Sequence, residues 1–142
     1  MLSLPILSIS IFIPLFSAVY IAFFISNSKS SRKRMYSMYV AILATTLTLI
    51  STIYMIVSFD TDSSGFQFVE RYSWIESIGL EFYVGVDGIS LYFIFLSALL
   101  TLICIVSSLF VIKKNIKEFI LCFLLIEAFC IGAFSSLNLL LF

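Results

Sequence analysis

The sequence predicts an all-α membrane protein that crosses the bilayer with four helices. Hydrophobic residues make up 62% of the 142 residues and charged residues only 11%, against about 25% charged residues in a typical soluble domain. The apolar residues fall into four long runs, none of which alternates with a period of two. Because backbone groups inside a bilayer must bond to one another, such runs form helices, and the missing alternation excludes a β-barrel.

Each predicted span has the length that a membrane helix needs. A helix of 24 residues rises about 36 Å, which crosses a hydrocarbon core of about 30 Å with some tilt. Only the fourth run contains a charge, Glu127. We expect one membrane region over residues 1–142, with spans at 4–26, 36–59, 89–112 and 119–142 and a longer connection at 60–88.

The charges of the connections predict the orientation of the spans. Residues 27–35 and 113–118 hold four and three basic residues, whereas residues 60–88 hold six acids and only Arg71. Positive charge stays on the side from which a chain is inserted. The first and third connections are therefore predicted on the cytoplasmic or matrix side, with the N-terminus and residues 60–88 outside. The many aromatic residues of 60–88 indicate an ordered excursion on the outer surface.

The composition argues against several classes of function. The formal net charge is zero, with no basic patch beyond one short loop, so we expect no nucleic-acid partner. The chain has no His, and Cys104, Cys122 and Cys130 lie inside apolar runs without a C-x-x-C pair. We expect buried thiols, no metal site, and the lipid bilayer as the surroundings.

Polar side chains recur at helical spacing in two spans. They are Thr45, Thr48, Ser51, Thr52 and Met55 in the second span, and Ser90, Ser97, Thr101, Cys104 and Ser108 in the third. Small and hydroxyl residues at this spacing let helices approach closely and hydrogen-bond across the contact. Plain helix packing and a water-filled proton path are both compatible with the pattern.

Glu127 is an acid deep in the fourth predicted span. An ionised group at a helix centre costs about 2.5–3.5 kcal/mol on insertion scales, and such acids usually face a bundle interior, where they pair or handle protons. Asn138 follows eleven residues later, on the same face of a continuous helix. Two interpretations remain: an acid hydrogen-bonded to a neighbouring helix, or a proton path with Glu127 and Asn138 as its candidates.

The string VGVDGIS at residues 84–90 precedes the third span. Gly85, Asp87, Gly88 and Ser90 make up the structural motif of this string, and Asp87 is predicted to cap the helix by accepting a hydrogen bond from a backbone N–H two or three residues on. Its charge also suits a helix N-terminus. Gly85 and Gly88 are expected to let the chain turn sharply at the membrane surface.

A family resemblance rests on two stretches, FYVGVDGISLYFIFLSALLTLICIVSS and KKNIKEFILCFLLIEAFCIGAFSSLNLLLF. They resemble the N-terminal part of chain M of the proton-pumping NADH–quinone oxidoreductase, respiratory complex I, whose mitochondrial counterpart is subunit 4. The resemblance is strongest from Trp74 to Phe142, about half of the chain. Subunits of multisubunit cation/proton antiporters carry similar strings and are the alternative.

The resemblance implies a membrane-arm subunit with an antiporter-like, multi-helix fold. Such a subunit contributes to proton translocation coupled to electron transfer from NADH to quinone, beside other membrane-arm subunits. It binds no cofactor itself, because NADH, flavin, iron–sulfur clusters and quinone belong to other subunits of the complex. The membrane would be the bacterial or the mitochondrial inner membrane.

The resemblance also implies that the chain is an N-terminal fragment. In the family, the run resembling SSLNLLLF continues into a helix with a central glutamate, and a buried lysine follows further on. We therefore expect that the chain alone is not catalytic. It would act with a separately encoded C-terminal half, or be an inactive four-helix remnant.

Overall fold

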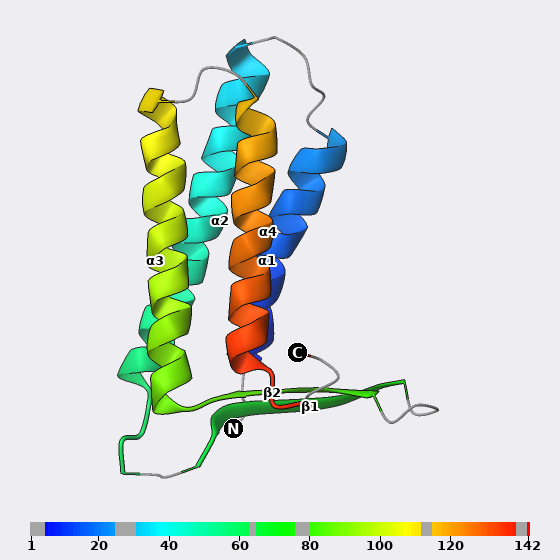
Figure 1. Cartoon of the computed structure of the whole chain (residues 1–142), viewed down its shortest axis with the longest axis vertical. Helices are drawn as coiled ribbons and strands as arrows, with labels where there is room; N and C mark the ends of the chain where they lie inside the picture. The colour runs from blue at the N-terminus through cyan, green and yellow to red at the C-terminus, as the bar shows by residue number, and fades with distance from the viewer. Residues whose placement is uncertain (1–4, 25–30, 63–64, 76–79, 112–114, 139–141) are drawn as a thin grey trace.

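The computed structural model describes residues 5–24, 31–62, 65–75, 80–111, 115–138 and 142. Helices and strands within these residues are α1 (Ile6–Phe24), α2 (Ser31–Val57), β1 (Gln67–Ile75), β2 (Leu80–Val86), α3 (Gly88–Val111) and α4 (Ile116–Ser135). Four helices stand side by side, and the two strands lie across one end of them (Figure 1). We call this end of the molecule the hairpin end and the other the opposite end.

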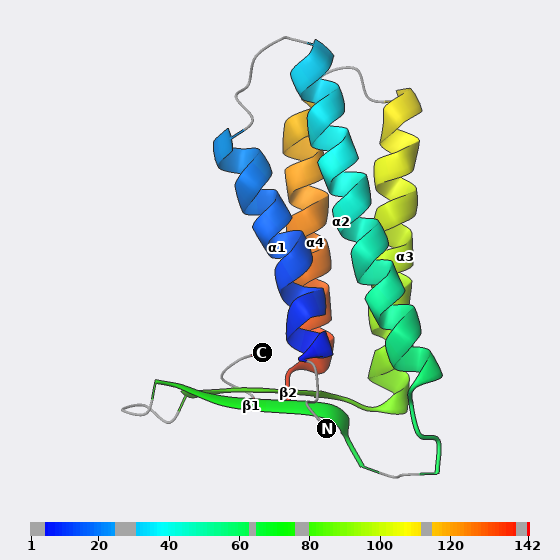
Figure 2. The same ribbon diagram turned by 180° about the vertical axis from the view of Figure 1, so that it is seen from behind.

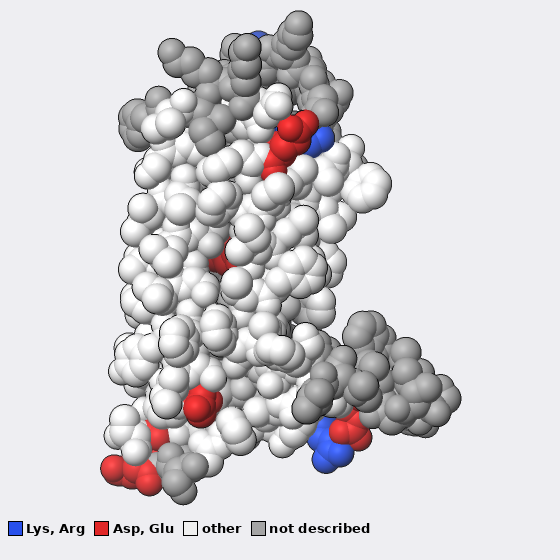
Figure 3. Space-filling model, in the orientation of Figure 1, with Lys and Arg blue, Asp and Glu red and all other residues white. Residues whose placement is uncertain are grey.

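The four helices form an antiparallel bundle in which α1 and α3 each pack against both α2 and α4 (Figures 1 and 2). Each contains a stretch that is long and apolar enough to cross a membrane. The stretches are Ile6–Phe23, Met35–Val57, Gly88–Ser108 and Ile116–Ser135. Charged side chains gather at the two ends of the face in Figure 3, and the broad band between them is uncharged except for recessed acidic atoms. The four predicted membrane helices are thus confirmed.

The helix ends differ from the ends of the apolar runs. α2 begins at Ser31, before the predicted start, because the basic residues there are good helix formers. α4 ends at Ser135, whereas the run predicts a helix to residue 142. Ser136 is extended, with φ −69° and ψ 123°, and the Leu137 N–H donates to the Tyr83 carbonyl at 3.0 Å. The chain leaves the helix because its backbone pairs with β2.

β1 and β2 form an antiparallel hairpin beneath the bundle (Figures 1 and 2). The expected ordered excursion is therefore a sheet, which adds a β element to a mostly helical chain. Val84 and Val86 of β2 are fully buried against the bundle, so one face of the hairpin closes the hairpin end. α1 begins at the hairpin end, where the Leu7 N–H bonds to Glu70 of β1, and this is compatible with the predicted alternation of the spans (Figure 1).

Two apolar clusters fill the bundle, one toward each end. The cluster toward the opposite end contains Ala18, Ile21, Met38, Ala41, Ala44, Ile105, Ile116, Ile120 and Leu124. The cluster toward the hairpin end contains Leu7, Met55, Val84, Val86, Leu91, Ile94 and Ile131. The residues that lie between these two clusters form the candidate functional site.

Candidate functional site

Buried polar residues occupy the middle of the bundle, between the two apolar clusters. On α4, Glu127 lies between Leu124 of one cluster and Ile131 of the other. The other three helices place polar residues between their cluster residues in the same way. We call this set the polar layer: Ser10, Thr45, Thr48, Thr52, Thr101 and Glu127, none more than 5% exposed.

Glu127 is the acid of the polar layer, and its side chain is fully buried. Neither carboxyl oxygen has a hydrogen-bond partner among the described residues. The Thr48 side chain of α2 is close enough to interact with the carboxyl. Its hydroxyl, however, donates to the Ala44 carbonyl at 2.7 Å. A buried polar group without a partner costs free energy, so an acid kept here points to a role other than stability.

Most hydroxyls of the polar layer bond to their own helix. Thr45 donates to the Ala41 carbonyl at 3.0 Å, and Thr101 donates to the Ser97 carbonyl at 2.9 Å. Such bonds satisfy the hydroxyls and leave compact, weakly polar surfaces that neighbouring helices approach closely. For these residues the packing interpretation of the predicted stripes is sufficient.

Ser10 and Ser51 are different, because they join two helices. The Ser10 and Ser51 hydroxyls lie 2.8 Å apart across the α1–α2 contact. Ser10 also contacts the Ile6 carbonyl at 2.8 Å, and Ser51 contacts the Thr48 carbonyl at 2.7 Å. Pro14 has no N–H, so the Ser10 carbonyl lacks the donor that a helix would otherwise supply. The contact is thus polar in both its side chains and its backbone.

Glu70 of β1 caps the start of α1. Its carboxylate accepts hydrogen bonds from the Leu7 N–H at 3.0 Å and the Ser8 N–H at 3.3 Å, and also from the Ser8 hydroxyl. The first N–H groups of a helix have no partner within it, and Pro5 supplies no capping side chain. A carboxylate from another element takes that place and also suits the helix dipole.

A bulge in β1 aims Glu70 at the helix. Gln67 pairs with Val86 and Glu70 with Val84, so β1 has one residue more than β2 over this stretch. Phe68 within the bulge has a φ of 51°. Directly paired residues point to the same face of a sheet, so Glu70 faces the bundle with Val84. Without the extra residue its side chain would point away from α1.

The structure explains the VGVDGIS string only in part as predicted. The Asp87 carboxylate accepts a hydrogen bond from the Ser90 N–H at 2.8 Å, which is the expected cap of α3. The side chain and N–H of Ser90 hold the pKa of Asp87 below its ordinary value. Gly85, however, lies inside β2, and Gly88 is the first residue of α3. The chain passes from β2 to α3 at Asp87, between the two glycines, and their role in that turn stays a prediction.

Gly85 is required by packing. A Cβ at this position would lie 2.7 Å from Leu137 Cδ1 and 3.1 Å from Val69 Cγ2. Leu137 is held there because its N–H bonds the neighbouring Tyr83 carbonyl. A Cβ at Gly88 would meet only the Phe59 ring, at an ordinary 3.7 Å. The first glycine lets the chain after α4 lie against β2, and the second has no such steric role.

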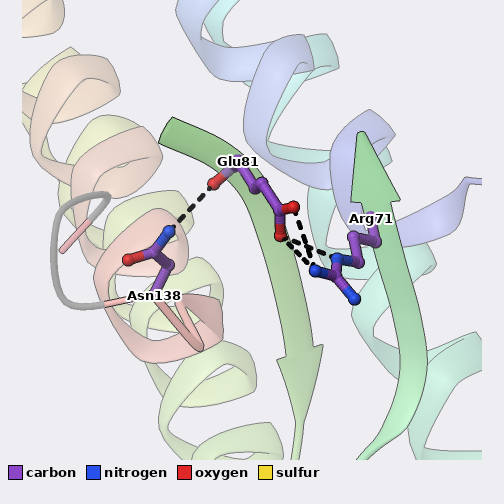
Figure 4. A network of polar contacts seen from close by, with 3 residues as sticks. All are labelled: Arg71, Glu81 and Asn138. Carbon is purple, nitrogen blue, oxygen red and sulfur yellow. Dashed lines mark hydrogen bonds and ion pairs between the residues drawn. The ribbon is translucent and has the colours of Figure 1, made fainter. Parts of the chain in front are cut away.

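Asn138 does not share a helix face with Glu127, because α4 ends three residues before it. Its amide donates to the Glu81 carbonyl at 3.4 Å (Figure 4). The Glu81 side chain pairs with Arg71 on the outer face of the hairpin, with Arg71 Nε and Nη2 donating at 2.7 and 2.9 Å. Arg71 Cζ also lies 5.5 Å from the centre of the Tyr83 ring. Asn138 thus helps to hold the end of the chain on the hairpin.

Sequence reasoning found Glu127 but missed Ser10 and Glu70. Ser10 lies at helical spacing from Ser3 and Ser17 in the first run, a pattern that could have marked it, whereas Glu70 is one of six acids in a connection. A helix that starts at a proline without a capping side chain is the available signal that a distant acceptor is needed. It does not identify which acid supplies it.

The fold and the polar layer define a class: a multi-pass membrane protein whose helix bundle buries an acid at its middle. No protein-family model matches the chain. Individual proteins do. The chain is 62% identical to NADH-quinone oxidoreductase subunit M of Rickettsia conorii over 142 residues, which is all of the chain and 29% of that relative.

More distant relatives carry the same description. The chain is 38% identical over 136 residues to NADH-quinone oxidoreductase subunit M of Rhodobacter capsulatus, covering 96% of the chain and 26% of that protein. It is 37% identical over 103 residues to NADH-ubiquinone oxidoreductase chain 4 of Marchantia polymorpha, covering 72% and 21%. The chain belongs to the subunit M family of NADH–quinone oxidoreductase, which confirms the resemblance. It spans less than a third of the length of these relatives.

Proposed function

We propose that the chain is a membrane part of an NADH–quinone oxidoreductase and contributes to proton translocation driven by electron transfer from NADH to quinone. The observation that carries the proposal is the 62% identity to subunit M over the whole chain. A bundle with a buried, unpartnered acid is what a proton-handling membrane subunit requires, and this supports the same function.

The proposal includes partners and cofactors. The chain would pack against other membrane-arm subunits and work with the remainder of subunit M, whether that is supplied on the same or another chain. NADH, flavin, iron–sulfur clusters and quinone would be bound by other subunits. Among the described residues, no cluster of His, Cys, Asp or Glu could hold a metal ion.

The proposal also includes an orientation. Arg32 and Lys117 lie at the opposite end of the bundle, next to further basic residues in the sequence. Basic residues favour the side of insertion, so the opposite end would face the cytoplasm or matrix. The hairpin end and the N-terminus would then face the periplasm or the intermembrane space of a bacterial or mitochondrial inner membrane.

The first test is assembly. Gently solubilised membranes that contain the tagged chain are separated on a native gel, stained for NADH oxidation and probed for the tag. We expect the chain to co-migrate with a large NADH-oxidising complex. A chain that migrates alone would refute the proposal, and co-migration with an antiporter lacking NADH oxidation would favour the related transporter family.

The second test is proton transfer in the assembled complex. Glu127→Gln should lower the number of protons moved per NADH oxidised while the chain remains inserted and assembled. Glu118→Gln is the matched control, because Glu118 lies on the same helix but is exposed near the opposite end. Equal proton yields for both variants and the unmodified complex would return Glu127 to a packing role.

A further inference from the structure

We propose that a groove beside the start of α3 binds one phospholipid with a primary ammonium head group, as in phosphatidylethanolamine, with Asp87 on the ammonium group and the acyl chains along α3. Glu127 does not line this groove. The inference therefore goes beyond the proposed function and does not rest on it.

The groove lies between the chain that follows α2 and the first turns of α3. It has a volume of about 520 Å³, within the range of about 300–1,000 Å³ that ligand pockets occupy. Phe59 and Thr61 line it on the side of α2. Its α3 side is lined by Ile89, Tyr92, Phe93 and Leu96. These four residues are spaced by three and four positions, so they share one face of the helix, and the groove runs along that face.

The groove changes from polar to apolar along α3. Thr61 and Asp87 line it at the hairpin end, where the membrane-spanning stretch of α3 begins. Leu96 follows Asp87 by nine residues, which is about 13 Å along a helix, and half of a hydrocarbon core is about 15 Å. The groove thus has a polar end at the membrane surface and an apolar end inside the bilayer. A phospholipid has the same polarity, and a water-soluble ligand does not.

The charge at the polar end favours a cation. Residues 35–112 contain one basic residue, Arg71, and it pairs with Glu81 at 2.7 Å. Asp87 lines the groove, and an acid stands on each side of Thr61 in the sequence. On the face in Figure 3, the hairpin end below α3 shows acidic side chains and no basic ones. This end therefore attracts an ammonium group and repels a head group that is only negative.

Asp87 can hold an ammonium group without giving up its role as the cap of α3. One of its carboxylate oxygens accepts from the Ser90 N–H at 2.8 Å. A carboxylate offers about four lone-pair sites, so the cap leaves room for a donor from outside the chain. Hydrogen bonds between a carboxylate and an ammonium group are about twice as strong as neutral ones. The cap also holds the carboxylate in position, which lowers the cost of ordering it on binding.

Packing holds two aromatic rings of the groove in place. The Phe93 ring stacks on Phe134 of α4, with the ring centres 5.2 Å apart. The Phe59 ring lies 3.7 Å from the position that a Cβ of Gly88 would take, so the glycine leaves the groove open beside this ring. Tyr92 adds a ring that is 64% exposed. Aromatic faces attract an ammonium group within about 6 Å, so these rings favour the same head group as Asp87.

Native mass spectrometry of the 142-residue chain measures the preference directly. The chain is released from micelles that contain equal amounts of phosphatidylethanolamine and phosphatidylglycerol with the same acyl chains. We expect it to retain about fivefold more phosphatidylethanolamine. Asp87→Asn should abolish the preference, because Asn keeps a cap for α3 but removes the charge. Tyr92→Leu should lower the preference by about twofold, because it removes a ring and keeps an apolar side chain.

Matched controls distinguish the groove from the general surface. Asp62→Asn removes an exposed acid that does not line the groove. Tyr54→Leu removes a ring of α2 that is 56% exposed and also lies outside the groove. Both controls should retain the preference of the unmodified chain, and circular dichroism verifies that every variant stays helical. Equal retention of the two lipids by the unmodified chain, or an equal loss in controls and groove variants, would overturn the proposal.

A second experiment identifies the occupant of the groove in cell membranes. Leu96 at the apolar end is replaced by photoreactive p-benzoylphenylalanine, and illumination should attach a phospholipid that is identified by its mass after digestion. A cross-link to a polypeptide instead would mean that the groove binds a protein segment, and it would overturn the proposal. Neither experiment measures NADH oxidation or proton transfer, so the lipid site and the proposed function can fail separately.

Discussion

Replacing Glu70 by alanine should destabilise the chain more than replacing any exposed acid of the hairpin. The substitution leaves the Leu7 and Ser8 N–H groups at the start of α1 without the carboxylate that accepts from them. It also releases β1 from the helix, because these bonds join residues 62 and 63 positions apart in the sequence.

The magnitude follows from the contacts that are lost. Loss of an N-terminal cap costs about 0.5–2 kcal/mol. Loss of a negative charge beside a helix N-terminus adds about 0.3–1 kcal/mol. We therefore expect Glu70→Ala to lower the free energy of unfolding by about 1–3 kcal/mol. Glu70→Gln should cost less than half of this, because its amide oxygen still accepts from the backbone.

Glu81→Ala is the matched control, since it removes the same kind of side chain from the other strand of the hairpin. Glu81 pairs with Arg71 at 2.7 Å, but the two side chains are 36% and 65% exposed. Such surface pairs contribute about 0–1 kcal/mol. Unfolding in mixed micelles with increasing dodecyl sulfate, followed by the helical circular dichroism signal, measures all three variants. Equal losses for Glu70→Ala and Glu81→Ala would refute the capping role of Glu70.

Three further predictions concern the ends and the middle of the bundle. Asp87→Ala should destabilise α3 by about 1 kcal/mol at neutral pH. Because folding lowers the pKa of Asp87, its contribution to the free energy of unfolding should be complete above the ordinary pKa of 3.8 and should be lost as the pH falls through the lower folded pKa. Asp87→Asn should abolish this pH dependence without removing the cap. Gly85→Ala should lower the free energy of unfolding by about 1–3 kcal/mol through the clash with Leu137. In a double-mutant cycle, Leu137→Ala should recover most of that free energy, whereas additive losses from the two substitutions would contradict the contact. Glu127→Leu should raise the free energy of unfolding by about 1–3 kcal/mol, because it removes an unpaired buried carboxyl. A lower free energy of unfolding in the same assay would mean that Glu127 has a stabilising partner.

The membrane helices could be predicted because one strong physical rule determines them. A long apolar run has no other way to satisfy its backbone in lipid, so its length and composition are sufficient. The end of α4 could not be predicted by the same rule. The run continues without interruption to residue 142, and the helix ends at Ser135 because Leu137 finds a backbone partner on β2. That partner is more than fifty residues away in the sequence.

The residues of the candidate site also fall into two groups: those that the sequence could identify and those that it could not. Glu127 could be identified because a charge inside an apolar run is costly wherever the helix packs. Asn138 was predicted from helical spacing to lie on the same helix face as Glu127. This prediction is wrong because α4 ends at Ser135, before it reaches Asn138. Glu70 and Ser10 depend on the bulge in β1 and on the crossing of α1 with α2. Neither feature leaves a local pattern in the sequence.

The hairpin connects these observations. It caps α1 through Glu70, it is followed directly by the Asp87 that caps α3, and it holds the chain after α4 beside Gly85. Three of the four helices are therefore fixed at one end by a single element, while the polar layer lies between apolar clusters above it. A bundle with an unpaired acid at its middle would relax toward any arrangement that hydrates or pairs that acid. Fixing the helix ends by the hairpin opposes such relaxation without placing a hydrogen-bond partner from the described residues beside Glu127, as the proposed proton transfer requires. The stability of the hairpin and the protonation of Glu127 should therefore be coupled. A substitution that destabilises the hairpin should also change how Glu127 binds and releases protons.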